Sequence, residues 1–456
     1  MNITDLGFDC LVQCFWHLSI EDLLNVFDAH WALKPAARHV FKRTHGHKMI
    51  RFDQIFKCDY LRYLRYLGLF RFSDKMVSIY QLKLCFQFLR CFGDLVHDID
   101  FIFCYGKRHE LIPRQWEHIF VHQLNKFCCG TLTQIRFDGS LVNYKNSDLN
   151  VLTKPFVRVE RLKSQIFFPP QFKLNVLFPK LRELELLNIK YDPATYDGDV
   201  FLNNDFMANR FPYLEHLTIN LEPRYRYEKE NFAIAVRLSP NIKALKGNIW
   251  FEVLFKPNLF VPLWNADRHF QILENLDLVV NLHFKPRLTE ILTTTASQYL
   301  HFKNLKELRI LFCDQSIDDT VTEWKFPFIC EKLESLTLLS SHGRLKQFSN
   351  ILNKHPTVKK LEIKYYGMAM TADECSTISK AFPLLEEIIF KTLPEDIGGA
   401  INMFGSLKCF KYYTTPTDSY FVAGHILRTL TGWSVSNIIL DPRTDTHRLI
   451  QGQRNN

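Results

Sequence analysis

Hydrophobic and polar residues alternate in a short unit that recurs along most of this chain. A clear copy lies in residues 178–189, where Leu181, Leu184 and Leu186 follow the spacing apolar-x-x-apolar-x-apolar. Because successive side chains of a strand point to opposite faces, Leu184 and Leu186 are predicted to share one face, with Glu185 on the other. A unit this short cannot bury its own apolar face, so it is predicted to stack on copies of itself.

The unit recurs thirteen times, at a mean spacing of about 28 residues, which is within the range of leucine-rich repeats. Its first positions fall at Val96, Leu132, Val159, Leu181, Leu214, Ile242, Leu273, Leu305, Leu333, Val358, Leu385, Leu407 and Val435. The units at Val159 and Ile242 are weak, because Ser164 and Gly247 occupy their last apolar positions.

Prolines precede several of these units and predict how each repeat ends. Proline terminates a helix and moves the residue before it out of the helical region. The pairs are Phe178-Pro179, Phe211-Pro212, Ser239-Pro240, His355-Pro356 and Phe382-Pro383. Residues 345–352 and 372–381 are predicted helices between strands. We therefore predict an α/β fold over residues 94–456: a right-handed leucine-rich-repeat solenoid of about 13 irregular repeats, with a concave parallel sheet and helices on the convex side.

The first 45 residues carry a different, helical pattern. Ser19 is a predicted N-cap, with Asp22 three positions later to complete a capping box, and Pro35 suits the first turn of a further helix. Residues 1–45 are thus predicted to form a three-helix domain. Residues 46–93 are predicted to be a helical connector and cap, because apolar residues recur there at steps of three and four.

This N-terminal segment resembles an F-box. The matching positions are Leu6, Asp9, Leu11, Phe15, Leu18, Ser19, Asp22, Leu23, Leu24 and Trp31. Gly7 stands where the family usually has proline, and Cys14 where it favours isoleucine. Joined to the repeats, the segment makes the whole chain similar in architecture to F-box/leucine-rich-repeat proteins.

The resemblance implies a substrate-recognition subunit of a cullin-RING (SCF-type) E3 ubiquitin ligase, not itself an enzyme. Its expected partners are a SKP-family adaptor, a cullin and a protein substrate for ubiquitin-dependent catabolism. The residues expected to bind the adaptor are Leu6, Leu11, Phe15, Leu18, Asp22, Leu23, Leu24 and Trp31. An alternative is that the apolar residues of this segment only build a helical hairpin that caps the repeats of a binding scaffold.

Side chains between the apolar strand positions are predicted to face the concave side and to contact a target protein. They are Glu185, Thr218, Asp277, Arg309, Thr337, Glu362, Lys364, Lys411 and Tyr413. Their charge is mixed in sign, and arginine and tyrosine are frequent anchors of protein interfaces.

Composition narrows the remaining possibilities. The net charge is +9, but Lys and Arg are spread thinly, which favours a solvated surface over nucleic acid as a partner. A nucleic-acid-associated protein is the second alternative, and it would need a contiguous basic stripe. No apolar run approaches the ~18 residues of a membrane span. Twelve cysteines without a Cys-x-x-Cys pair suggest reduced thiols and a cytoplasmic or nuclear location. Asp5 and Asp9 precede any basic residue, which does not fit a signal peptide.

No familiar catalytic pattern stands out. The sequence has no His-Glu-x-x-His, no phosphate-binding glycine loop and no Gly-x-Ser-x-Gly elbow. His45, His47 and Cys58 have no matching cysteine pair for a zinc site. We therefore expect no catalytic residue, no metal and no cofactor, and a function in binding.

Overall fold

The protein has two compact units, Met1–Asn241 and Ile242–Asn456. The computed structural model describes residues 2–51, 74–102, 122–138, 154–164, 174–189, 211–221, 241–247, 271–281, 300–313, 328–340, 355–365, 370–390, 396–414, 430, 432–439 and 448–455. Each unit combines helices with a mainly parallel sheet, so the predicted α/β class is confirmed.

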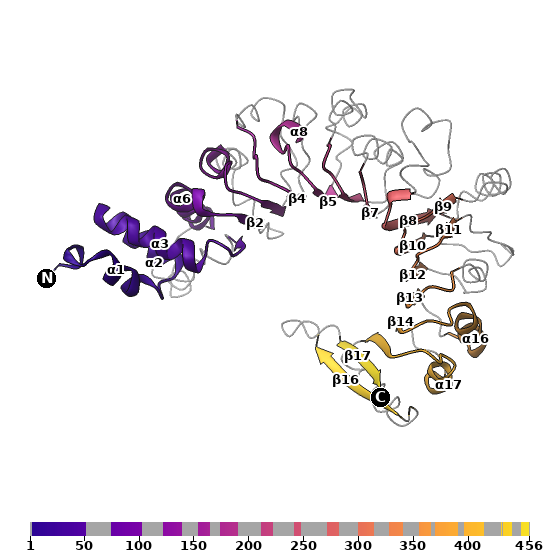
Figure 1. Ribbon diagram of the computed structural model, residues 1–456. Coiled ribbons are helices and arrows are strands. Elements are labelled where there is room, and N and C mark those ends of the chain that lie inside the picture. Colours follow the sequence, from indigo (N-terminus) through magenta and orange to yellow (C-terminus); the bar gives the residue numbers. More distant parts are fainter. Residues whose placement is uncertain are drawn as a thin grey trace. The chain divides into compact units, whose positions relative to one another are not determined.

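The first unit begins with helices and continues into strands (Figure 1). Its described elements are η1 (Ile3–Asp5), α1 (Phe8–Phe15), α2 (Ile20–Ala29), η2 (Trp31–Leu33), α3 (Lys34–Thr44), β1 (Ile50–Arg51), α6 (Asp74–Phe92), η3 (Gly93–Leu95), β2 (Asp98–Ile102), β3 (Gln134–Asp138), β4 (Arg161–Ser164), α8 (Leu174–Leu177), β5 (Glu183–Ile189) and β6 (His216–Leu221). The strands β1 to β6 pair in parallel and in chain order.

The second unit contains more strands and fewer described helices. Its elements are β7 (Ala244–Gly247), β8 (Asn275–Asn281), β9 (Leu300–Phe302), β10 (Glu307–Cys313), β11 (Phe328–Cys330), β12 (Ser335–Ser340), β13 (Lys360–Tyr365), α16 (Ala372–Ala381), β14 (Glu387–Phe390), α17 (Ile397–Asn402), β15 (Cys409–Thr414), β16 (Trp433–Ile439) and β17 (Arg448–Arg454). Its main sheet runs β7-β8-β10-β12-β13-β14-β15-β17-β16, and β9 pairs with β11 alone. In Figure 1, α16 and α17 lie on the same side of this sheet.

Strand register follows the repeated unit. In the second unit Leu276, Leu308, Leu336 and Leu361 pair directly, strand to strand, and all four are buried. In the first unit Leu184 is aligned in the same way and is also buried. A shift of one residue would expose every one of these side chains, so burial on one face fixes the register.

The predicted positions of the strands are confirmed from Val96 to Leu407. Each of these twelve first positions lies two residues before the start of a strand.

The proline turns also form where they are described. The Leu181 amide donates to the Phe178 carbonyl at 3.2 Å, and the Leu385 amide donates to that of Phe382 at 3.1 Å. The turn thus sets the chain direction just before the strand starts.

The last predicted repeat, at Val435, is wrong as a parallel unit. β16 begins at Trp433, before Val435, and β17 lies between β15 and β16 and is antiparallel to both. A parallel return needs a long crossover, whereas the short connection between β16 and β17 permits only a hairpin. Gly452 on β17 pairs with Phe410 on β15, and a Cβ at this position would overlap the Phe410 ring. The described sheet therefore ends in an antiparallel closure.

The predicted helices can be compared with the described ones. The predicted helix 372–381 is α16, and Thr371 and Glu374 close its capping box. The predicted connector helix is α6 where it is described. The predicted helix 345–352 lies outside the described residues. The strands β1, β9 and β11 were not predicted. None of the described helices is long and apolar enough to cross a membrane.

Candidate docking surfaces

The three N-terminal helices form where the sequence predicts them, for the predicted reasons. The Ser19 hydroxyl accepts from the Asp22 amide at 3.1 Å, and the Asp22 carboxylate accepts from the Ser19 amide at 3.4 Å. This capping box starts α2, and Pro35 lies in the first turn of α3. α1 and α2 both pack against α3.

The structure divides the predicted adaptor-binding residues into three groups. Leu11, Phe15, Leu23 and Leu24 are buried, so they form the core on which the helices pack. Leu6 and Leu18 are half-buried. Asp22 and Trp31 are exposed, and the Trp31 side chain is 75% exposed. A partner of this arrangement can therefore contact Trp31 directly, but not the four buried side chains.

Two further apolar side chains are exposed and were missed as site residues: Phe8 in α1 and Trp16, the C-cap residue of α1. Phe8 is 47% exposed and Trp16 is 42% exposed. Phe8 lies on the same helical stripe as Leu11 and Phe15, but α3 covers only part of it, through a T-shaped contact with His39 at 5.5 Å between ring centroids. The sequence shows the apolar stripe, but it does not show that α3 leaves Phe8 partly uncovered.

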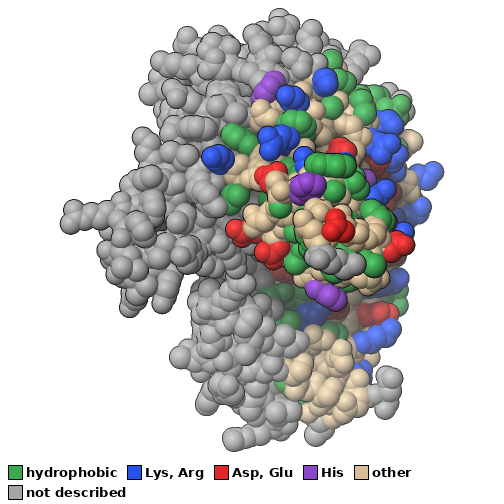
Figure 2. All heavy atoms as spheres, turned by 90° about the vertical axis from the view of Figure 1, so that its left-hand side faces the viewer, with side chains coloured by type: hydrophobic (Ala, Val, Ile, Leu, Met, Phe, Trp, Pro, Cys, Tyr) green, Lys and Arg blue, Asp and Glu red, His purple; other side chains and the backbone are tan. Residues whose placement is uncertain are grey.

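Figure 2 shows the side of the molecule on which these helices lie in Figure 1. Hydrophobic side chains are visible there among acidic, basic and histidine side chains. Large exposed apolar side chains of this kind mark interaction sites more often than isolated surface leucines do. We name Phe8, Trp16 and Trp31 the N-terminal docking residues.

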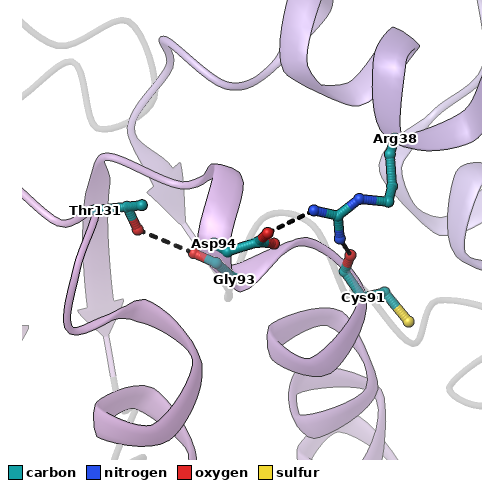
Figure 3. Close-up of polar contacts among 5 residues, drawn as sticks. All are labelled: Arg38, Cys91, Gly93, Asp94 and Thr131. Atoms are coloured by element: carbon teal, nitrogen blue, oxygen red, sulfur yellow. Dashed lines mark hydrogen bonds and ion pairs between the residues drawn. The ribbon is translucent and has the colours of Figure 1, made fainter. Parts of the chain in front are cut away.

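The N-terminal helices are joined to the first strands by a polar network (Figure 3). Arg38 of α3 donates to the Cys91 carbonyl at 2.5 Å and to the Asp94 carboxylate at 2.5 Å. Next to Asp94, the Gly93 carbonyl accepts from the Thr131 hydroxyl at 3.3 Å, just before β3. A Cβ at Gly93 would lie 2.8 Å from the Cys128 sulfur, so the close approach requires glycine here.

Aromatic rings fill the apolar part of the same junction. Phe41 of α3 stacks on Phe92 of α6, with ring centroids 4.5 Å apart, and meets Phe88 edge-on at 5.6 Å. Phe27 of α2 adds an edge contact with Phe92 at 5.6 Å. Phe41, Phe88 and Phe92 are fully buried. The helices and the start of the sheet are thus packed as one body, as expected for a connector without a flexible linker.

The predicted target-binding residues occupy strand positions that share one face of each sheet, here called the polar face. In the first unit Glu185 pairs in register with Thr218. In the second unit a row of four neighbours crosses β8, β10, β12 and β13; it consists of Asp277, Arg309, Thr337 and Glu362. Lys411 is separated from this row by Ile389, which is buried. Lys364 and Tyr413 lie nearer the carboxyl ends of β13 and β15.

Charges on the polar face neutralise each other between neighbouring strands. Lys163 lies 2.7 Å from the Glu185 carboxylate in the first unit. In the second unit Arg309 lies 3.5 Å from the Asp277 carboxylate, and Lys411 lies 3.0 Å from that of Glu387. A target that binds through these side chains has to compete with pairs that already exist.

The pKa values of two carboxylates of this face are shifted in opposite directions. Burial raises the pKa of Asp277, although the Gly247 amide and Arg309 oppose the rise. Burial also acts to raise the pKa of Glu387, but hydrogen bonds and charge from Lys411 and Lys360 outweigh it, and the pKa lies below its ordinary value. Glu387 was not among the predicted site residues.

A second charged row was also missed, although the sequence contains it. The second residue of each repeat alternates in sign from Lys243 to Lys408. The row consists of Lys243, Glu274, Lys306, Glu334, Lys359, Glu386 and Lys408. Its pairs include Lys306 with Glu274 at 2.8 Å and Lys408 with Glu386 at 2.9 Å. Exposed pairs of this type contribute about 0–1 kcal/mol each.

The described residues do not converge on a chemical centre. Within them, no three His, Cys, Asp or Glu side chains are placed to hold a metal ion. Burial raises the pKa of Cys330 and of Cys375 to about 12, so neither thiol is ionised at neutral pH. What the structure presents are three exposed aromatic side chains on the N-terminal helices and a polar sheet face.

No family model and no curated protein matches this chain.

Proposed function

We propose that this chain is the substrate-recognition subunit of a cullin-RING (SCF-type) ubiquitin ligase and that its strands are the repeats of a leucine-rich-repeat solenoid. In this proposal α1 to α3 bind a SKP-family adaptor, and the polar face binds the target protein. Ubiquitin transfer is carried out by the partners. The subunit acts by holding target lysines near the charged enzyme, which raises their effective concentration.

One observation carries the proposal most directly. Phe8, Trp16 and Trp31 are large apolar side chains left exposed on helices whose own core is complete. Tryptophan and other aromatic residues are common anchors of protein interfaces. They surround a segment whose buried positions, Leu11, Phe15 and Leu23 among them, match the F-box pattern.

The junction beneath these helices supports the positioning role. Arg38 and Phe41 hold α3 against α6 and η3 through charged hydrogen bonds and ring stacking. A rigid connection keeps an adaptor on α1 at a constant distance from a target on the strands of the first unit. A flexible linker would spread that distance and lower the effective concentration.

A second function remains open: a leucine-rich-repeat binding scaffold without a ligase role. The observation that favours it is the burial of Leu11, Phe15, Leu23 and Leu24, because a hairpin that only caps the repeats needs the same core. The two functions differ in what they predict for Phe8, Trp16 and Trp31. A cap has no use for exposed tryptophans, whereas a docking surface requires them.

Affinity purification of the tagged full chain from cells separates the two functions. The ligase proposal predicts that an adaptor and a cullin co-purify, and that Trp16→Ala with Trp31→Ala removes both while target proteins remain. Co-purification of targets without adaptor or cullin would favour the scaffold. Leu11 and Phe15 are unsuitable probes, because both side chains are buried and a change there is expected to destabilise the helices as well.

A further inference from the structure

One charged position of the repeats alternates in sign over most of the chain. It is the second residue of each repeat, directly before the strand, where the second unit carries the row from Lys243 to Lys408. Three further members precede this row in the first unit: Glu160, Arg182 and Glu215. Ten consecutive repeats thus carry alternating charge here, and we name these ten residues the charge ladder. The next position shows no such rule, since successive repeats hold Asn275, Glu307 and Ser335 there.

In the second unit the charge ladder connects neighbouring repeats through the main chain and through side chains. The Lys306 amide donates to the Glu274 carbonyl at 2.8 Å, and the Glu334 amide donates to the Lys306 carbonyl at 2.9 Å. These bonds hold the three residues one strand spacing apart, about 4.8 Å. The Lys306 ammonium lies 2.8 Å from the Glu274 carboxylate. The pKa of Lys306 is raised, first by the hydrogen bond to Glu274 and by its charge, and further by the charge of Glu334. Lys306 thus interacts with the charge on either side of it.

The first unit repeats this arrangement. The Arg182 amide donates to the Glu160 carbonyl at 2.8 Å, and the Glu215 amide donates to the Arg182 carbonyl at 2.8 Å. The Arg182 guanidinium lies 3.8 Å from the Glu160 carboxylate and 3.6 Å from that of Glu215. An interior member of the charge ladder is therefore attracted by two neighbours of opposite sign, and not by one.

The apolar positions of the repeats do not determine which strands become neighbours. Leu308, Leu336 and Leu361 occupy equivalent positions of β10, β12 and β13, and all three are buried. If β10 paired with β13, with β12 excluded from the sheet, the same leucine side chains would meet. Incorrect assembly of this kind is a characteristic failure of repeat proteins. Another property has to distinguish the neighbouring strand from the one beyond it.

We propose that the charge ladder makes this distinction and so determines the order in which the repeats stack. In the native order β12 lies between β10 and β13 (Figure 1), and Lys306 lies beside Glu334. In the skipped order Lys306 would lie beside Lys359. Opposite charges on adjacent strands are stabilising and like charges are destabilising, so a skipped strand replaces attraction by repulsion. The inference concerns assembly of the sheet and does not depend on the proposed ligase function.

Disulfide trapping during refolding of the full chain tests the inference. Glu307→Cys with Lys360→Cys places one thiol on β10 and one on β13. In the native sheet both positions pair with Ser335, so they lie two strand spacings apart, about 9.6 Å, beyond the ~7 Å limit for a disulfide. If β10 pairs with β13, the two positions come within about 5 Å and can be linked. Mass spectrometry of the linked peptides measures the fraction of chains with the skipped order.

Two substitutions of Lys359 in this double-cysteine chain give opposite expectations. Lys359→Glu attracts Lys306 in the skipped order and repels the two glutamates beside it in the native order. It is expected to raise the yield of the link between positions 307 and 360 at least about fivefold at low salt. Lys359→Gln, the matched control, removes the native attraction without attracting Lys306, and is expected to change the yield less than about twofold. About 1 M salt should remove the difference, because it shortens the screening length to about 3 Å.

Each possible result decides the inference. A larger yield for Lys359→Glu than for Lys359→Gln, lost at high salt, supports it. Equal yields, or a difference that salt does not reduce, would show that alternating charge has no part in the order of the repeats. Absence of the link in every variant would also overturn the inference, because the skipped order would then need no exclusion. The link forms during refolding, so the comparison holds even if the charge reversal lowers the yield of native protein.

Discussion

The N-terminal helices expose aromatic side chains, whereas the charged side chains of the polar sheet face are paired with each other. On the N-terminal helices, the aromatic side chains of Phe8, Trp16 and Trp31 are exposed. On the sheets, charged side chains pair between adjacent strands, as Lys163 does with Glu185 and Arg309 with Asp277. The helices are therefore prepared to gain free energy by contact, whereas the polar face must exchange existing pairs for new ones. This predicts strong, general docking at one end and selective recognition along the sheet.

The largest expected effect is at the junction between helices and strands. Phe41→Ala removes a fully buried ring stacked on Phe92, which is expected to cost about 3–5 kcal/mol of unfolding free energy. Urea unfolding measures the loss. Phe8→Ala, which removes a half-exposed ring, is the control and is expected to cost less than about 1 kcal/mol. Equal losses for the two variants would contradict the packing described here.

The second-largest loss of unfolding free energy is expected for a buried leucine of the repeated unit. Leu308→Ala or Leu336→Ala should cost about 2–5 kcal/mol, because each leaves a cavity between paired strands. If the strands act as stacked repeats, hydrogen exchange should increase first in β10, β12 and their neighbours. Thr337→Ala, on the polar face between them, is the control. Unchanged unfolding of the leucine variants would show that the register is wrong.

Substitution of Arg38 is expected to cost less unfolding free energy, and its effect is expected to be confined to the junction between α3 and α6. Arg38→Ala loses the bonds to the Cys91 carbonyl and to Asp94, at a cost of about 1 kcal/mol for a partly exposed pair. Arg38→Lys keeps the charge but cannot reproduce both contacts of the guanidinium fork. Both variants should raise hydrogen exchange in the last turn of α6. Full protection in Arg38→Lys would mean that charge alone holds the junction.

The smallest effects concern pH and separate two carboxylates of the second unit. The pKa of Glu387 is lowered in the folded state, so its contribution is complete above the ordinary value of 4.5 and is lost as pH falls through the folded pKa. Glu387→Gln should therefore destabilise by up to about 1 kcal/mol at pH 7 and by less at acidic pH.

Asp277 should behave in the opposite way. Its pKa is raised by burial, so the charged form is less favourable in the folded state than in the unfolded chain. Asp277→Asn keeps an acceptor for the Gly247 amide and should leave stability at pH 7 unchanged or slightly higher. Thermal melting against pH measures both variants. The same sign for the two would contradict the difference between them.

Sequence reasoning predicted the parts of the fold that repeat. Leu308 and Leu336 were placed correctly because a period of two and a recurring unit define both face and register. The hairpin of β16 and β17 was missed because strand direction depends on a connection, which the apolar pattern does not encode. Ser19 and Asp22 were predicted to cap α2 because capping is local, within three residues.

The candidate site was less predictable for a related reason. Leu11 and Phe8 lie on one apolar stripe of the sequence, but only packing against α3 decides which of them remains exposed. Asp277 and Glu387 are both acidic strand residues, and their opposite pKa shifts depend on neighbours in other repeats. Exposure and charge pairing are tertiary properties, so the sequence indicated a surface but not its composition.

The most direct test of the account is isothermal titration of the full chain with a purified SKP-family adaptor. We expect saturable one-to-one binding. Phe8→Ala with Trp16→Ala should weaken it at least about tenfold, roughly 1.4 kcal/mol, without changing urea unfolding by more than about 1 kcal/mol. No heat of binding from the wild-type chain, or equal affinity of the double variant, would contradict the assignment of α1 as the docking helix.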